Sequence, residues 1–364
     1  MEKYRILTIN PGSTSTKIAL FDNDELVFKK NLTHEAEKLA EFNDISEQLP
    51  YRTQMVIDAL EENNIKLETI DAFSGRGGGL TSVVGGTYEI NDLLLHHSKI
   101  GYTMKHASVL GAQIAYDLAK VHNKKAYVVN PVTVDEKEEV SRITGIKGIY
   151  NESMFHALNQ KEVAYKYAKQ INKQYNDLNL IVVHLGGGIS VGAHRKGKVI
   201  DVNNALNGDG PFAPTRSGKI PVIDIIDMCY SGKYTKEEMI ELITKKGGFV
   251  SHLGTSDARD VKKMIEQGEK YAKLVYDAMI YQVAKEVGAC GAVLKGKIDG
   301  IILTGGIAND QYFVNSLKDY IEYMGEIAVF PGEEEMEALS NGALRVLRNE
   351  EEALEYTGKP VYVK

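Results

Sequence analysis

Two arginines stand among small residues, and this setting makes them candidates for binding an anion. Arg76 lies in SGRGGG and Arg216 lies in FAPTRSG. Surface arginines usually sit among other charged side chains, whereas these two are placed where a ligand could reach them. The planar guanidinium matches the paired oxygens of a carboxylate or a phosphoryl group. The two segments indicate a site for an anionic substrate, although each arginine alone could equally be structural.

Two turns rich in small residues are a second candidate for anion binding. NPGSTSTK runs from Asn10 to Lys17, and HLGGG runs from His184 to Gly188. The first is not a P-loop, because the second glycine is missing and an alternating strand pattern follows it. Backbone N–H groups left open by small side chains can still bind phosphate oxygens. Plain hairpin turns are the alternative. The candidate phosphate-binding residues are Asn10, Ser13, Ser15, Lys17, His184, Gly186, Gly187 and Gly188.

Other segments have both a functional and a structural interpretation. Thr304-Gly305-Gly306 ends an apolar strand and is expected to open a helix, whose N-terminus would favour an anion. Asp257 in SDAR is a candidate ligand-binding residue or a helix cap, and His156 in MFHALNQ is a candidate donor or a buried structural histidine. The acidic run 135–139 is expected to be a solvated helix start rather than a metal cluster.

The elements that must position these residues form two related halves. The same order of apolar runs and turns appears in residues 4–30 and again in residues 178–202. This repeat predicts a three-stranded meander in each segment, with Gly12 and Gly186 in equivalent turns. Strands alternating with amphipathic helices favour an α/β fold. We expect one domain over 1–150 and another over 151–334, with a C-terminal helix at about 335–349 packed on the first. Further helices are expected at 50–63, 108–122, 152–176, 221–230, 235–245 and 257–295. We expect 70–80 to be a short strand running into a glycine cluster, 125–134 a strand that Pro131 ends, 298–310 a strand with a Gly-Gly turn and a helix start, and 326–331 a last strand.

Composition narrows the class of protein. The 364 residues are 43% hydrophobic and 26% charged, with a net charge of −7 and a pI near 5.8. This acidic balance argues against a nucleic-acid partner. No apolar run reaches the length of a membrane span, and no signal peptide is recognised, so we expect a cytoplasmic protein. Cys229 and Cys290 lie in apolar runs and are expected to be buried free thiols.

Seven segments in order resemble the acetate kinase family, and more closely its butyrate kinase branch. They are NPGSTSTK, SGRGG, FHALNQK, HLGGGIS, VNNALNGDGPFAPTRSG, LGTSDARD and LTGGIAND. The resemblance implies a duplicated actin-like (ribonuclease H-like) βββαβαβα fold with a nucleotide cleft between the halves. It also implies reversible phosphoryl transfer from ATP to a short-chain fatty acid, with Mg²⁺, giving an acyl phosphate such as butanoyl phosphate and ADP.

The resemblance also assigns roles to individual residues. Arg76 and Arg216 match arginines that hold the carboxylate and the transferred phosphoryl group, and His156 matches a histidine that donates to that group. His106 matches a substrate-side histidine, and Glu335, or its neighbour Glu334, matches an acidic residue that helps to hold Mg²⁺ together with Asn10. Residues matching the phosphate turns and the adenosine side are Asn10, Ser13, Ser15, Lys17, His184, Gly186, Gly187, Gly188, Asp257, Arg259, Gly305, Gly306 and Ile307.

The chain departs from the family pattern at two positions. Acetate kinases carry asparagine where this chain has Gly187, which favours the butyrate branch. The family's aspartate after YVV is Asn130 here, so the charge near the metal is lost while an oxygen acceptor remains. We expect Asn130 still to act as a catalytic residue that orients water or metal, with Asp135 as a substitute.

Three alternatives remain open from the sequence. The substrate could be acetate, propionate or a branched acid, because the pocket cannot be sized. An actin- or chaperone-like ATPase would share the fold but would give the arginine pair no role, and Asn130 is compatible with a weakly active ATP sensor. A homo-oligomer is expected, with the apolar 257–295 helix as one candidate interface.

Overall fold

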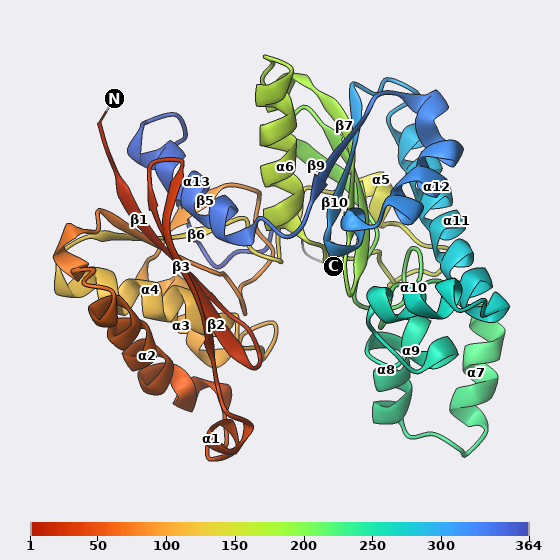
Figure 1. The fold of residues 1–364 in the computed structure, drawn as a ribbon, viewed down its shortest axis with the longest axis horizontal. Helices are drawn as coiled ribbons and strands as arrows, with labels where there is room; N and C mark the ends of the chain where they lie inside the picture. The colour runs from red at the N-terminus through yellow and green to blue at the C-terminus, as the bar shows by residue number, and fades with distance from the viewer. Residues whose placement is uncertain (1, 363–364) are drawn as a thin grey trace. The chain divides into compact units, whose positions relative to one another are not determined.

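The computed structural model describes residues 2–362, which form two compact units (Figure 1). The first unit comprises the chain up to Asp135 together with the segment from Glu334 onward, and the second unit comprises Glu136–Glu333. The last long helix, α13, thus belongs to the first unit. Across residues 2–362, no helix combines the length and the apolar character needed to cross a membrane.

The first unit is built on a mixed sheet. Within the described residues this sheet has seven strands, in the order β12-β5-β6-β4-β1-β2-β3. β1, β2 and β3 form an antiparallel meander, and β4 and β6 continue the sheet in parallel with β1. The strands are β1 (Arg5–Pro11), β2 (Ser15–Asp22), β3 (Glu25–Thr33), β4 (Ala72–Gly75), β5 (Thr87–Glu89), β6 (Lys125–Val129) and β12 (Leu354–Glu355).

Helices cover both faces of this first sheet. α13 packs its Ala343 and Leu344 onto Ile6 and Ala72. α4 crosses the other face so closely that a Cβ at Gly75 would lie 2.1 Å from the carbonyl oxygen of a facing helical residue, and α2 packs on α4. The helices are α1 (Ala36–Ala40), α2 (Leu49–Glu62), α3 (Asp92–Ile100), α4 (Val109–Val121) and α13 (Glu335–Leu347), with 3-10 turns η1 (Ile45–Gln48) and η2 (Leu67–Thr69).

The second unit repeats the central pattern of the first. Its sheet has five strands within the described residues, in the order β11-β10-β7-β8-β9. β7, β8 and β9 form an antiparallel meander, and β10 and β11 extend the sheet in parallel with β7. The strands are β7 (Asn179–Leu185), β8 (Ile189–Arg195), β9 (Lys198–Val202), β10 (Gly300–Gly305) and β11 (Ile327–Pro331).

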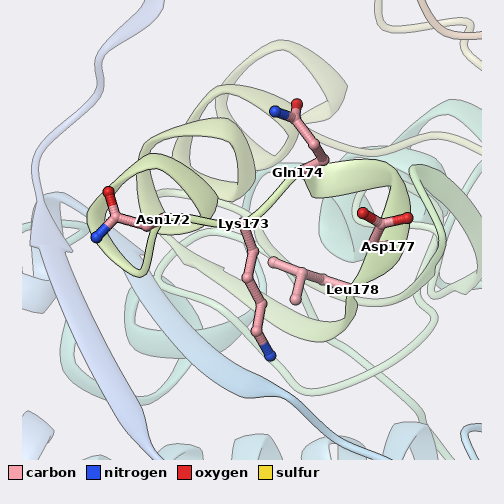
Figure 2. Close-up of a pocket in the computed structure, with 5 residues that line it drawn as sticks. All are labelled: Asn172, Lys173, Gln174, Asp177 and Leu178. Carbon is pink, nitrogen blue, oxygen red and sulfur yellow. The ribbon is translucent and has the colours of Figure 1, made fainter.

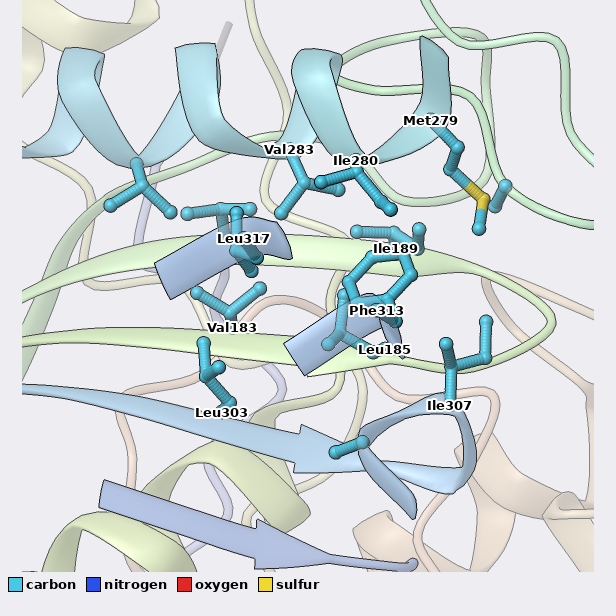
Figure 3. Packing of buried hydrophobic residues seen from close by; sticks show 14 of the residues in the cluster. Val183, Leu185, Ile189, Met279, Ile280, Val283, Leu303, Ile307, Phe313 and Leu317 are labelled. Atoms are coloured by element: carbon cyan, nitrogen blue, oxygen red, sulfur yellow. The ribbon is translucent and has the colours of Figure 1, made fainter. Parts of the chain in front are cut away.

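One large apolar core lies beneath the long helix α11 (Figure 3). Val183 and Leu185 of β7 point toward α11, where Ile280 and Val283 meet them. On the other face, Leu180 of β7 belongs to a separate cluster formed with α6. The helices are α5 (Glu139–Arg142), α6 (Ala157–Gln170), α7 (Val222–Tyr230), α8 (Lys236–Thr244), α9 (Gly248–Leu253), α10 (Ala258–Glu266), α11 (Lys270–Val293) and α12 (Gln311–Ile321), with 3-10 turns η3 (Tyr175–Asp177), η4 (Gly306–Asn309) and η5 (Glu322–Met324).

The predicted duplicated α/β fold is confirmed by this topology. In both units an antiparallel meander is followed by two parallel strands on the same side of its first strand. The turns predicted to be equivalent close in similar ways, since the N–H of Gly12 donates to the carbonyl of Ser15 and that of Gly186 donates to the carbonyl of Gly188. Each unit therefore carries one small-residue turn at the end of its first strand.

Two predicted helices were wrong in their extent. The single helix over 257–295 is two helices, because α10 ends at Glu266 and the chain turns through Gly268 with a φ of 89°. The helix expected over 152–176 spans only Ala157–Gln170 and begins after His156. Apolar spacing continues through both regions, whereas the breaks come from backbone turns that spacing does not record.

The prediction that Cys229 is buried was also wrong. Cys290 is buried, but Cys229 is exposed, because α7 buries none of its residues despite its apolar sequence. Val222 is 70% exposed and Tyr230 is 87% exposed. An apolar helix without a buried face is a physical departure from the usual pattern of a surface helix.

Candidate functional site

The candidate residues form two groups, one in each unit, and each group is described separately. The first unit holds the first small-residue turn, Arg76, His106, Asn130 and Glu335. The second unit holds His156, the glycine turn after His184, Arg216 and the segments near Asp257 and Gly305.

The first small-residue turn is held from below by a buried arginine. Arg52, on α2, is fully buried, and it donates to the carbonyls of Gly12 (2.8 Å), Ser13 (3.1 Å) and Ser15 (3.2 Å). In a trans peptide the C=O and N–H groups point in opposite directions. Because Arg52 binds the carbonyls of Gly12 and Ser13, the N–H groups of the following residues, Ser13 and Thr14, point away from Arg52. The turn is thereby shaped to offer donors to an anion.

Sequence reasoning missed Arg52. Its guanidinium is also held by Oε1 of Gln48, at 3.0 Å from Nε, and burial lowers its pKa. The only cue in the sequence is an arginine in the apolar stretch YRTQMVIDAL of a predicted helix. Its partners Gly12, Ser13 and Ser15 lie 40, 39 and 37 residues earlier in the chain, so local spacing does not reveal them.

His34 packs beside the same turn, and its protonation should make the stability of the protein depend on pH. Its Nε2 lies 2.8 Å from the hydroxyl of Thr16, and burial, with a smaller contribution from the charge of Arg52, lowers its pKa from 6.5 to about 4. Below pH 6.5 the unfolded chain therefore binds a proton that the folded protein excludes. We expect the free energy of unfolding to fall as the pH drops from about 6.5 to about 4.

Urea unfolding of the protein and of His34→Gln at pH 8, 6 and 4.5 measures this dependence. The variant should lose less stability between pH 8 and 4.5 than the unaltered protein does. An equal loss in both proteins would show that His34 does not contribute to it.

Asn10, Arg76 and Glu335 meet at the ends of β1 and β4. Asn10 lies near the end of β1, Arg76 follows β4, and Glu335 is the first residue of α13. Asn10 Nδ2 donates to Glu335 Oε2 at 2.6 Å, and Arg76 pairs with Glu335 Oε1. Glu335 thus contacts both residues that the resemblance assigns to the phosphoryl group and the metal.

Lys17, Ser13 and His106 are more loosely held. Lys17 is exposed and pairs with Asn10 across β1 and β2, so their side chains share one face of the sheet. Ser13 is exposed in the turn and Ser15 is partly buried. His106 accepts from the backbone of Ser108. Its pKa is lowered by partial desolvation and then by the charges of Arg76 and Arg52.

Asn130 has a clear structural use. It adopts a left-handed conformation with φ of 38°, which asparagine tolerates better than most residues. Its Oδ1 accepts from the N–H of Gly86 at 2.8 Å, and its own N–H donates to the Gly86 carbonyl at 3.0 Å. Asn130 therefore joins the end of β6 to the start of β5, while Asp135 is buried nearby in sequence. Among the described residues, no cluster of three His, Cys, Asp or Glu side chains could hold a metal by itself.

The prediction that 135–139 is a solvated helix start was wrong. Glu136 pairs with Lys161 at 2.9 Å and Lys137 pairs with Asp201 at 3.2 Å, with both lysines almost fully buried. The helix α5 begins only at Glu139. The charges face partners far away in the sequence, so the local pattern resembled an exposed segment.

In the second unit, two histidines and an arginine surround the glycine turn. The rings of His156 and His184 stack with centroids 3.8 Å apart and planes at 11°. Arg216 donates to the carbonyl of Gly187 at 2.8 Å, and Thr215 donates to the same oxygen at 2.9 Å. The structure therefore brings together His156, His184, Gly186–Gly188 and Arg216, as one candidate half-site.

One donor of this half-site is unsatisfied. Within residues 2–362, the buried Nε of Arg216 has no hydrogen-bond partner, and burial lowers the pKa of this guanidinium. A buried N–H without an acceptor costs about 1–3 kcal/mol. The half-site therefore holds an arginine with Nη1 bound to Gly187 and a buried Nε left without an acceptor.

Gly305 is the last residue of β10, which pairs with β7, and Gly306 and Ile307 follow it. The helix predicted to open at Thr304-Gly305-Gly306 begins at Gly306 as a four-residue 3-10 helix (η4), and the α-helix α12 starts only at Gln311. The N-terminus of an α-helix, with its positive dipole end, therefore does not lie at these glycines. The side chain of Ile307 lies in the apolar core (Figure 3), so only its backbone is available to a ligand.

Asp257 and Arg259 bind each other at the start of α10. Asp257 accepts from the backbone N–H of Arg259 as a helix cap, and their side chains pair at 2.6 Å. This pairing lowers the pKa of Asp257 to about 2. Asp257 is therefore the N-cap of α10, and the guanidinium of Arg259, which is 87% exposed, lies at the surface.

A polar pocket follows the C-terminal end of α6, whereas His156 precedes its first residue. It is lined by Asn172, Lys173, Gln174, Asp177 and Leu178 (Figure 2). α6 has 14 residues, which correspond to about 21 Å of helix. The pocket is therefore remote from the half-site at the start of the helix.

Duplicated sheets of this topology, each with a small-residue turn after its first strand, define an actin-like kinase fold. The chain belongs to the acetokinase family, whose model matches residues 147–349. This family comprises carboxylate kinases that use ATP and typically Mg²⁺.

Solved structures of similar proteins share the fold. The acetate kinase of Porphyromonas gingivalis is 20% identical, with a TM-score of 0.74 over 93% of this chain and 99% of that chain. A propionate kinase from Francisella tularensis is 22% identical, with a TM-score of 0.72 over 93% and 98%. The acetate kinase of Entamoeba histolytica is 19% identical, with a TM-score of 0.74 over 93% and 98%.

Proposed function

We propose that the protein phosphorylates a short-chain fatty acid with ATP, and that butanoate is the preferred acid. The observation that carries the proposal is the half-site at Gly187, where the buried Nε of Arg216 lacks an acceptor near two stacked histidines. Membership of a carboxylate kinase family supplies the reaction class. The choice of butanoate rests on the resemblance to the butyrate kinase branch.

Gly187 supports the choice of substrate only through the space that it leaves. A Cβ built at Gly187 would have no heavy atom within 4 Å, so neither packing nor backbone strain requires glycine at this position. The residue instead leaves open space at the turn, whose carbonyl accepts from Arg216. We propose that this space accommodates a longer acyl chain or a different position of the ATP phosphates.

The chemistry needs alignment and charge neutralisation rather than a base. A carboxylate is already ionised at neutral pH, so it can attack the γ-phosphorus of ATP in line without losing a proton. We assign Arg76 and Arg216 to the carboxylate and the transferred phosphoryl group, His156 as a donor to that group, and His106 to the substrate side. The assignment of Asn10, Ser13, Ser15, Lys17 and the glycine turns to phosphates, and of Asp257, Arg259, Gly305, Gly306 and Ile307 to the adenosine side, remains a proposal.

The residues near Glu335 fit a magnesium ion that is bound mainly through substrate. Mg²⁺ in kinases is commonly held by one or two carboxylates together with nucleotide phosphates. Glu335 supplies one carboxylate, and Asn10 lies within hydrogen-bond distance of it. When bound, the ion would neutralise the developing phosphate charge. Glu335 and Asn10 would hold it, and Arg76 would then be released from Glu335 to bind the substrate.

A panel assay tests the reaction class and the substrate separately. Acyl phosphate formed from ATP and each C2–C5 acid is trapped with hydroxylamine and measured. We expect product with several acids and the highest kcat/KM with butanoate, since one methylene changes discrimination by about 1–3 kcal/mol. No product with any acid would contradict the kinase proposal, and a preference for acetate or propionate would contradict only the choice of butanoate.

Replacing Glu335 by glutamine should raise the Mg²⁺ concentration that gives half-maximal activity by about tenfold or more. The amide keeps an oxygen but loses the charge that attracts the ion and pairs with Arg76. Mg²⁺ titration at saturating ATP measures the effect, with Glu337→Gln in the same helical turn as the matched control. An unchanged Mg²⁺ requirement would remove Glu335 from the proposed metal site.

Asn130→Asp in the same titration tests the hypothesis that this position orients metal or water. The added charge should lower the Mg²⁺ requirement if Asn130, or Asp135 in its place, lies near the ion. Unchanged Mg²⁺ dependence and turnover would leave Asn130 with its structural role at Gly86.

Homo-oligomer formation and a cytoplasmic location also remain proposals. Light scattering of the purified protein measures the oligomeric state.

A further inference from the structure

A buried polar stripe crosses the second sheet beneath α6. His184 on β7 and Ser190 and His194 on β8 point to the same face as the apolar cluster with α6. Asn159 and Gln160 face them from the first turns of α6, and all five side chains are buried. Buried polar groups are retained only with defined partners, so the direction of each hydrogen bond in the stripe can be worked out.

The amide of Gln160 has one allowed orientation. Its Nε2 lies 3.1 Å from the backbone carbonyl oxygen of Ser190, and a carbonyl can only accept. The amide oxygen must therefore face His194, whose Nε2 lies 2.9 Å away and must donate. Burial holds the pKa of His194 well below its usual value. Neutral His194 thus carries its proton on Nε2, and its Nδ1 accepts from the Tyr175 hydroxyl at 2.7 Å.

The hydroxyl of Ser190 then has one direction in which to donate. It accepts from Gln160 Nε2 at 2.8 Å, and its other partner within residues 2–362 is Nδ1 of His156, at 2.9 Å. If His156 carried its proton on Nδ1, the serine proton would be buried without an acceptor. Such a group costs about 1–3 kcal/mol. The network therefore favours a bare Nδ1 and a protonated Nε2 on neutral His156.

We propose that Ser190 and Gln160 are positioning residues that fix the tautomer and the ring orientation of His156, so that Nε2–H is the donor. The inference rests on the proposed function only for the use of that donor, namely the transferred phosphoryl group. Ser190 and Gln160 do not touch the phosphoryl group in this proposal. They act through His156, which keeps its donor at every pH at which the ring is neutral.

The surrounding backbone is shaped around this arrangement. A Cβ at Gly192 would lie 2.5 Å from Oε1 of Gln160, so the bond from His194 to that oxygen requires glycine on β8. The side-chain amide of Asn203 binds the backbone on both sides of Ser190. Its Oδ1 accepts from the N–H of Val191 at 2.7 Å, and its Nδ2 donates to the carbonyl of Ile189 at 3.1 Å. Both features hold Ser190 in position before any ligand binds.

Histidine NMR tests the tautomer without any substrate. In protein with ¹⁵N-labelled imidazole rings, long-range proton–nitrogen correlations distinguish protonated from bare ring nitrogens. The spectrum is recorded above pH 8, and His156 is assigned by the signal lost in His156→Gln. We expect Nε2 to be protonated and Nδ1 bare. The opposite tautomer in the unaltered protein would overturn the proposal.

Two variants test the cause of this preference. Ser190→Ala removes the donor to Nδ1 and should give a mixture of tautomers, with kcat lowered about tenfold and KM for ATP changed less than threefold. Gln160→Glu places only acceptors near Ser190, so the hydroxyl should turn toward residue 160 and His156 should shift its proton to Nδ1. The kcat should then fall about 10²–10³-fold, as expected for a lost donor to the transition state.

Tyr175→Phe is the matched control. It removes a buried hydroxyl from the far end of the same network and should leave the tautomer of His156 unchanged. An unchanged tautomer in Ser190→Ala would overturn the proposal even if Gln160→Glu does not fold. A shifted tautomer with unchanged turnover would overturn the catalytic part of it. Inactivity toward every acid, together with the expected tautomer, would contradict the proposed function and leave the positioning of His156 intact.

Discussion

Replacing Arg216 by alanine is expected to lower kcat for acyl phosphate formation by about 10²–10³-fold. Removing one donor to the charge that develops in a transition state typically costs about 3–4 kcal/mol. Arg216 already has a buried Nε without a partner and is held at Gly187 through another nitrogen. The variant should fold normally, because it gives up one unsatisfied donor along with that contact.

Arg216→Lys separates charge from geometry. Lysine keeps the positive charge but not the planar fork, so most of the loss should remain. Arg195, which is 41% exposed and pairs with Glu138, provides the matched control, and Arg195→Ala should retain turnover. Steady-state rates and thermal melting are measured together. Near-normal kcat in a folded Arg216→Ala protein would remove this residue from the mechanism.

Arg76→Ala in the first unit should lose turnover to a similar extent. Here the pairing with Glu335 predicts an additional effect, because the freed carboxylate changes the surroundings of the proposed metal. A loss in kcat with an altered Mg²⁺ dependence is therefore expected for Arg76→Ala but not for Arg216→Ala. Equal Mg²⁺ dependence in both variants would show that the pairing has no role in binding the ion.

Replacing Arg52 by methionine is expected to destabilise the first unit by about 3 kcal/mol or more. Three carbonyls of the first turn would lose a buried donor, and each unsatisfied group costs about 1–3 kcal/mol. For a unit of this size, 1 kcal/mol corresponds to roughly 2–4 °C in Tm, so the midpoint should fall by about 6–12 °C.

The same variant should weaken ATP binding, because the carbonyls would no longer be held on the side of Arg52 and the N–H groups of Ser13 and Thr14 would lose their common direction. Calorimetric unfolding and KM for ATP are the measurements. Arg195→Met supplies the control for loss of an arginine at the surface. A small change in Tm together with unchanged KM would show that the turn holds its shape without Arg52.

The repeated architecture could be predicted because its signals are local. Each meander alternates apolar and polar residues around a turn of small residues, and this pattern fixes strand partners that are close in the chain. Arg76 and Arg216 could also be named as candidates, since they stand among small residues, and their roles remain proposals. Such residues can be picked out from their immediate neighbours in the sequence.

The supporting residues could not be found in this way. Arg52 contacts the turn near Gly12, and Gln160 contacts Ser190, across separations at which only the folded sheet brings the partners together. The same limit explains the error at Glu136, since Lys161 neutralises it from another element. Sequence patterns identify groups that could bind a ligand, whereas the groups that orient them depend on tertiary contacts.

The return of α13 to the first unit has a consequence for synthesis in the cell. Glu335 and the apolar face that covers Ile6 and Ala72 are translated only after the whole second unit. A nascent chain emerging from the ribosome therefore leaves the α13-covered face of the first sheet bare, and it cannot yet join Asn10 and Arg76 through the Glu335 carboxylate. The apolar surface that α13 covers therefore stays exposed until α13 is made, and a chain terminated before α13 would keep it exposed.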